Sequence, residues 1–86
     1  MNVTKCIKTM MINHDIKHID VANKIGYTKQ GFSNLLKKNN YKLNDIIAIA
    51  DIIGYDVELH FTDRNSNDNI ILKSNDDWFW YIAIIL

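Results

Sequence analysis

The polar side chains best suited to contact the edges of DNA bases lie close together near the middle of the chain: Thr28, Lys29, Gln30 and Asn34. A glutamine amide can pair bidentately with adenine, and a lysine can donate to O6 and N7 of guanine. Asn34 follows Gln30 by four residues, so the two side chains would face the same way on a helix. Taken singly, each is equally consistent with a solvated polar residue on an exposed face.

A second group of residues flanks the first and carries side chains that can hold phosphate oxygens: His18, Ser33, Lys37, Lys38 and Tyr41. Contacts of this kind fix the register of a protein on a duplex without reading its sequence. These two groups can form an interface with double-stranded DNA only when the fold brings them to one face.

These side chains need two helices to position them, and the spacing of apolar residues predicts both. Ala22 and Ile25 share one face of a helix expected over residues 19–25, and Phe32 and Leu36 share one face of a helix expected over residues 28–37. Gly26 can close the first helix in a left-handed conformation. Thr28 is a suitable N-cap for the second.

Two short helices joined by a turn that contains glycine form the helix-turn-helix unit, whose second helix enters the DNA major groove. Small Ala22 is expected where the two helices cross, and the second helix has a polar outer face. An ordinary helix pair in a small bundle is the alternative.

Two further helices are predicted on either side of this unit. The first covers about residues 2–12, with an apolar stripe of Val3, Ile7, Met10 and Met11, and Cys6 is placed on its buried face. The other covers residues 43–53, begins at Asn44 or Asp45 and is closed by Gly54. Its inward residues are expected to be Leu43, Ile46, Ile47, Ala50 and Ile53. A strand is possible in this isoleucine-rich segment, but the stripe favours a helix.

After Gly54 the spacing of apolar residues changes, from a repeat of nearly four residues to a repeat of two. Tyr55, Val57, Leu59 and Phe61 alternate with polar residues, as in a half-buried strand. Residues 63–69 are turn-forming, and residues 70–72 make a second short strand, so residues 55–73 are predicted to form a β-hairpin. An isolated hairpin is marginally stable at best, so this one must pack on the helices or pair with another chain.

Nine consecutive apolar residues follow at positions 78–86 and cannot all face water. They form either a buried strand, which their composition favours over a helix, or a contact surface for a second subunit or another partner. The residues predicted to form a dimer or partner interface are Val57, Leu59, Phe61, Trp78, Trp80 and Ile82.

The net charge of zero hides an asymmetry between the two halves of the chain. Residues 1–50 carry eight lysines against three aspartates, a net charge of +5, and residues 51–86 carry two basic against seven acidic residues, a net charge of −5. The split predicts a basic module that binds a polyanion and an acidic remainder with another role. The basic module covers residues 1–54 and the acidic remainder covers residues 55–86.

Other chemistry is not indicated. The sequence shows no nucleophile–base arrangement, paired carboxylate site or phosphate-binding glycine loop, so neither an enzyme nor a cofactor is expected. His14, His18 and His60, with the single Cys6, do not predict a metal site. No signal peptide is visible and the longest apolar run is too short to span a bilayer, so we expect a cytoplasmic protein.

With the four helices placed, residues 3–56 resemble the Cro/cI-type (lambda-repressor-like) helix-turn-helix family of phage and bacterial regulators. The matching segments are DVANKIGYTKQGFSNLLK and LNDIIAIADIIGYD. The resemblance implies a compact four- or five-helix domain that usually binds an operator as a dimer. Two departures matter: a hairpin replaces a fifth helix, so the family's usual dimer surface does not carry over, and Gly31 stands where a larger polar residue is common.

The sequence thus predicts a mainly α fold with a small β element, namely a four-helix lambda-repressor-like helix-turn-helix domain followed by a C-terminal β-hairpin or small sheet. The expected function is that of a sequence-specific DNA-binding transcriptional regulator, such as a repressor, acting as a homodimer. The alternative is a protein-binding module, such as an antitoxin or a phage-encoded inhibitor of a host defence nuclease, that uses the acidic, aromatic C-terminal half.

Overall fold

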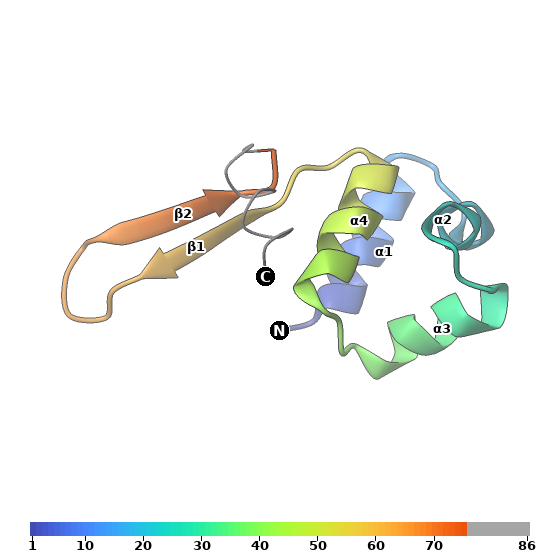
Figure 1. Ribbon diagram of the computed structural model, residues 1–86, viewed down its shortest axis with the longest axis horizontal. Helices are drawn as coiled ribbons and strands as arrows, with labels where there is room; N and C mark the ends of the chain where they lie inside the picture. The colour runs from blue at the N-terminus through green and yellow to red at the C-terminus, as the bar shows by residue number, and fades with distance from the viewer. Residues whose placement is uncertain (76–86) are drawn as a thin grey trace. The chain divides into compact units, whose positions relative to one another are not determined.

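The computed structural model describes residues 1–75, which form four helices followed by a two-stranded antiparallel sheet (Figure 1). The elements are α1 (Val3–Asn13), α2 (His18–Ile25), α3 (Lys29–Lys38), α4 (Leu43–Ile53), β1 (Glu58–Thr62) and β2 (Asn69–Lys73). The predicted fold class, mainly α with a small β element, is confirmed. The chain divides into two compact units, Met1–Tyr55 and Asp56–Leu86, which are described separately.

One hydrophobic core holds the first unit together, and every helix contributes two buried side chains to its central cluster. These are Ile7 and Met11 of α1, Val21 and Ala22 of α2, Phe32 and Leu36 of α3, and Ile49 and Ile53 of α4. Phe32 is the largest of the fully buried side chains. The apolar stripes read from the sequence therefore face one another as expected, because each short helix must bury one side to be stable.

The structure corrects three details of these stripes. Leu43 was expected to face inward but is 39% exposed, because it is the first residue of α4 and lies at the opposite end of the helix from the clustered Ile49 and Ile53. Cys6 is exposed, although it was expected on the buried face of α1. It precedes the buried Ile7 by one residue, which turns it about 100° around the helix, away from the core. Ile49 is fully buried but was not expected to face inward. Because α4 packs against both α1 and α2, it buries a wider arc than a single stripe.

Local signals set the helix ends. Gly26 closes α2 at φ +87°, Gly54 closes α4 at φ +111°, and the Thr28 Oγ1 accepts the Gly31 N–H at 2.9 Å at the start of α3. These three roles were predicted and are confirmed. The predicted bounds of α4, residues 43–53, are confirmed, but the helix does not open at Asn44 or Asp45. Lys42 holds the N-cap position, and the Asp45 carboxylate accepts the Lys42 N–H at 3.3 Å.

The segment that follows α1 is tied to the end of α4. The His14 Nδ1 lies 2.8 Å from the Ile53 carbonyl oxygen, and the His14 ring stacks on Tyr55 with centroids 4.6 Å apart. A carbonyl oxygen can only accept, so Nδ1 carries the proton in this hydrogen bond. Tyr55 also packs against the hydrophobic cluster, which corrects the prediction that it opens the first strand.

In the second unit, β1 and β2 pair in antiparallel register from Glu58↔Lys73 to Thr62↔Asn69. At the open end of this hairpin, the Val57 N–H donates to the Ser74 Oγ and the Ser74 N–H donates to the Val57 carbonyl, both at 2.8 Å. The expected hairpin is therefore present, but its first strand begins at Glu58, three residues later than predicted. The expected burial is also incomplete, since Leu59 is half-buried whereas Phe61 is 57% exposed.

Candidate nucleic-acid interface

The residues predicted to contact DNA surround α2 and α3, which are joined by a three-residue turn at residues 26–28. Figure 1 shows α2 end-on and α3 lying across the view, so the two helix axes are far from parallel. Ala22 of α2 is 0% exposed and Phe32 of α3 is 1% exposed. Both helices thus turn their buried sides to the same core and leave the other side of α3 open to solvent.

The open side of α3 carries three of the four predicted base-contacting residues, Lys29, Gln30 and Asn34, and all three are exposed. The Gln30 Nε2 donates to the Asn34 Oδ1 at 3.0 Å, which confirms that these side chains face the same way. Because this hydrogen bond uses only one of the two amide protons of Gln30, both amides keep groups that can pair with a base edge.

The fourth predicted base contact, Thr28, is exposed, and its hydroxyl oxygen holds the first turn of α3 as its N-cap. A Cβ atom added to Gly31 would lie 3.0 Å from the Thr28 Oγ1. This approach is closer than most real Cβ contacts, so a larger residue at position 31 would require the capping threonine to shift.

The other end of α3 carries exposed Lys37 and Lys38 in its last turn, where cations also stabilise the helix dipole. Asn39 ends the helix in a left-handed conformation at φ +49°. Its Oδ1 accepts the Thr4 N–H at 3.1 Å, and the Thr4 Oγ1 donates to the Leu36 carbonyl oxygen at 2.6 Å. These bonds fix the end of α3 to the start of α1.

Two of the predicted phosphate contacts are less free than the sequence suggested. The Tyr41 hydroxyl is hydrogen-bonded to the Thr4 Oγ1, and Tyr41 and Ser33 are both only partly exposed. A phosphate would have to share the Tyr41 hydroxyl with Thr4. The role of Thr4 was not predicted, because its partners Leu36 and Tyr41 lie more than thirty residues away in the sequence.

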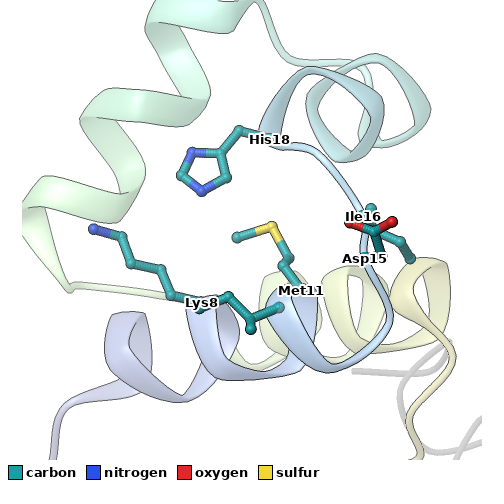
Figure 2. A pocket seen from close by; sticks show the side chains of 6 residues that line it. Lys8, Met11, Asp15, Ile16 and His18 are labelled. Atoms are coloured by element: carbon teal, nitrogen blue, oxygen red, sulfur yellow. The ribbon is translucent and has the colours of Figure 1, made fainter.

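His18, the remaining predicted phosphate contact, lines a hollow of about 460 Å³ between α1 and α2. Figure 2 shows its ring extending from the start of α2 toward Met11, with Lys8 reaching out from α1. The hollow is lined by Lys8, Met11, Ile12, Asp15, Ile16 and His18. The His18 ring also meets the Phe32 ring edge-on, with centroids 6.3 Å apart.

Lys8 was not predicted as part of the site. On the sequence it is one more polar residue of the first helix, and only the packing of α1 beside the start of α2 brings it into the same hollow as His18. The two side chains supply one ammonium and one imidazole to this region, together with the carboxylate of Asp15. Sequence spacing offered no signal for this pairing, because the two residues belong to different helices.

The charge of the first unit suits a polyanion. It contains eight lysines and four aspartates, a net charge of +4 over residues 1–55. All eight lysines are exposed. A lysine on the surface contributes to a positive potential that attracts a phosphate backbone.

The predicted interface residues of the second unit are only partly described. Val57 and Leu59 are half-buried and Phe61 is exposed, whereas Trp78, Trp80 and Ile82, with the strand expected for residues 78–86, lie outside the described residues. Within residues 1–75, no helix is long and apolar enough to cross a membrane, and no three His, Cys, Asp or Glu side chains are grouped to hold a metal ion.

No protein-family model, curated protein or solved structure matches this chain.

Proposed function

We propose that this chain is a sequence-specific DNA-binding regulator of the Cro/cI-type helix-turn-helix family, in which α3 enters the major groove of an operator. The observation that carries the proposal is the solvent-facing Gln30–Asn34 pair, held at 3.0 Å on the second helix of a helix–turn–helix unit. Helices presented in this way contact base edges through their N-terminal residues.

The base contacts are assigned to Lys29, Gln30 and Asn34, next to the Thr28 cap. Gln30 pairs bidentately with adenine and Lys29 donates to guanine. The hydrogen bond from Gln30 to Asn34 restricts the glutamine side chain before binding. Less side-chain freedom is then lost when the DNA arrives, which improves affinity without a new contact.

The phosphate contacts are assigned to residues on both sides of the exposed helix: Lys8, His18, Ser33, Lys37, Lys38 and Tyr41. No side chain caps the start of α2, so the backbone N–H groups of His18 and Ile19 can donate to a phosphate oxygen, whereas the Asp20 N–H already donates to the Lys17 carbonyl oxygen at 3.1 Å. Lys37 and Lys38 approach the backbone from the opposite end of α3. Each neutralised phosphate releases counterions, which makes the affinity fall as salt rises.

The regulator acts as a homodimer in the cytoplasm, paired through the second unit. One helix-turn-helix covers a half-site, and two half-sites on one face of the duplex lie about 34 Å apart. In the described part of the sheet, β1 and β2 each pair on one side only. Pairing of strand edges across a two-fold axis would satisfy the unpaired backbone groups.

A gel-shift titration against genomic fragments, the chain's own promoter among them, tests the proposal. Gln30→Ala should weaken binding to the preferred fragment by about 1–3 kcal/mol and relax the preference at one base pair. Asn23→Ala is the matched control, because Asn23 is an exposed amide of α2 that does not line the hollow of His18. Its affinity should stay at the wild-type value.

Lys37→Ala or Lys38→Ala should weaken binding to all fragments alike and reduce the salt dependence. If no fragment is bound at low salt, the proposed function is wrong. If fragments are bound but the triple alanine variant of Lys29, Gln30 and Asn34 binds the preferred one like the wild type, the assignment of α3 as the reading helix is wrong.

The proposed dimer is tested by measuring the mass of the protein in solution. Sedimentation of the full chain at tens of micromolar, a concentration above typical micromolar dissociation constants, should give twice the monomer mass. A monomer under these conditions would contradict pairing through the second unit.

A second candidate function is protein binding through the second unit, as in an antitoxin or a phage-encoded inhibitor of a host defence nuclease. The observation that favours it is the exposure of Phe61 (57%) and Ile70 (68%) in a unit of net negative charge. Apolar exposure of this kind marks interaction surfaces. The gel-shift titration separates the two functions, since a chain that only binds protein would shift no DNA fragment.

A further inference from the structure

The β-hairpin has two faces of different chemistry. The register pairs Leu59 with Leu72 and Phe61 with Ile70, and paired residues of an antiparallel sheet point to the same side. These four residues form what we name the apolar face. The opposite face carries Glu58, His60, Thr62, Asn69, Ile71 and Lys73.

The apolar face is incompletely covered in the described residues. Phe61 and Ile70, toward the turn, are 57% and 68% exposed, while Leu59 and Leu72 are half-buried. A two-stranded hairpin is marginal in water without a further layer on its apolar side. This face therefore needs an occupant.

We propose that the apolar face is covered by residues 78–86 of the same chain. Only residues 74–77 separate the end of β2 from Trp78, and two hydrogen bonds of 2.8 Å hold Ser74 against Val57 at the open end of the hairpin. The segment thus departs from a fixed point next to the sheet. All nine of its residues are apolar.

Length and proximity both favour this occupant over a second copy. Nine residues in extended form reach about 30 Å, whereas a five-residue strand spans about 17 Å, so the segment can cross the whole face. A segment on a short linker meets its site at an effective concentration in the millimolar range, about a thousandfold above a protein at micromolar concentration.

The inference goes beyond the proposed function, and its failure would not touch DNA binding. Its success would cover Phe61 and Ile70 and so remove the exposure that favours the second candidate function. It places Leu59 and Phe61 inside the core of their own subunit instead of between copies. The outer edges of β1 and β2 remain available to a second copy, because the cover lies on a face and the edges carry the unpaired backbone groups.

The full chain provides a selective probe, because its two tryptophans, Trp78 and Trp80, both belong to the proposed cover. Tryptophan emission of the native chain should be blue-shifted and protected from acrylamide quenching, compared with the urea-unfolded chain. Ile70→Asn should shift the emission to the red and raise the quenching toward the unfolded value. Ile71→Asn is the matched control, because this neighbour carries the same side chain on the opposite face.

The expected result is a change for Ile70→Asn, little change for Ile71→Asn, and emission that does not vary with protein concentration from nanomolar to micromolar. Emission of the native chain at the unfolded position would overturn the proposal, since the segment would then be in water. Equal responses of the two variants would also overturn it, placing the segment elsewhere, including on the helical unit. Emission that moves to the red on dilution would identify a second copy as the source of the cover.

Discussion

Replacement of Gly54 by alanine is expected to cost more stability than replacement of Gly26, although both glycines close a helix with positive φ. An ideal Cβ at Gly26 meets no atom within 4 Å, whereas one at Gly54 lies 3.3 Å from the His14 Nδ1. Both positions carry a backbone cost for an L-residue, which is larger at Gly54 because φ +111° lies farther from the left-handed region than φ +87° at Gly26. They also differ in what the new methyl group displaces. Gly26→Ala is the control for Gly54→Ala.

The magnitudes follow from the contacts. Holding alanine in a left-handed conformation destabilises the folded state by about 1–2 kcal/mol. Alanine also lowers the conformational entropy of the unfolded chain, which stabilises the folded state by about 0.4–1 kcal/mol. Gly26→Ala should then destabilise by about 1 kcal/mol. Gly54→Ala must also move the His14 ring, which is bonded to the Ile53 carbonyl oxygen and stacked on Tyr55. Weakening these two contacts, on a side chain that is partly in water, adds about 1–2 kcal/mol.

Urea unfolding followed by far-UV circular dichroism measures both variants, and a double-mutant cycle identifies the cause. In a His14→Ala background the ring is gone, so Gly54→Ala should cost about 1–2 kcal/mol less than it does in the wild-type chain, and the backbone cost remains. Equal costs for the two glycine variants in the wild type, or an undiminished cost of Gly54→Ala without His14, would refute the packing of His14 against the end of α4.

Three further predictions concern the first unit. Ala22→Leu should overpack the core between α2 and α3 by about 1–3 kcal/mol, and an unchanged melting temperature would argue against the observed packing of these helices. Thr4→Val should leave the Leu36 carbonyl oxygen without its side-chain donor and destabilise by about 1–3 kcal/mol, whereas Thr4→Ser, which keeps the hydroxyl, should lose much less in the same urea titration. Lys8→Ala should lower the slope of log affinity against log salt by about 0.9 if it contacts one phosphate, and a slope equal to that of the wild type would remove Lys8 from the interface beside His18.

Much of the fold could be predicted because its signals are local. The pairs Ile7 with Met11 and Phe32 with Leu36 are four residues apart, and this spacing alone places each pair on one buried face. Gly26 and Gly54 mark helix ends for a conformational reason that does not depend on the rest of the chain. Ile49 was missed because its burial depends on α4 meeting two helices at once, which no periodicity within α4 records.

The candidate site was predictable to the same extent. Gln30 and Asn34 share a face by spacing, and the structure adds the hydrogen bond between them. The engagement of Tyr41 by Thr4 and the placement of Lys8 beside His18 could not be predicted. Both depend on where α1 packs against later helices, and such packing joins residues with no regular separation in the sequence.

The side chains that hold α3 in the fold are not the ones that we propose contact DNA. Phe32 and Leu36 fill the core, and the Thr28 cap and the bonds from Thr4 hold the two ends. None of these contacts uses the exposed side chains of Lys29, Gln30 or Asn34. Their only mutual hydrogen bond in the described structure, from Gln30 to Asn34, is an exposed pair on a helix of a kind that contributes about 0.2–0.5 kcal/mol.

Alanine also has a higher helix propensity than lysine, glutamine or asparagine, which offsets that small loss. The triple alanine variant of Lys29, Gln30 and Asn34 should therefore unfold within about 1 kcal/mol of the wild type while it loses its preferred DNA fragment. A large loss of stability would mean that these side chains hold the fold together.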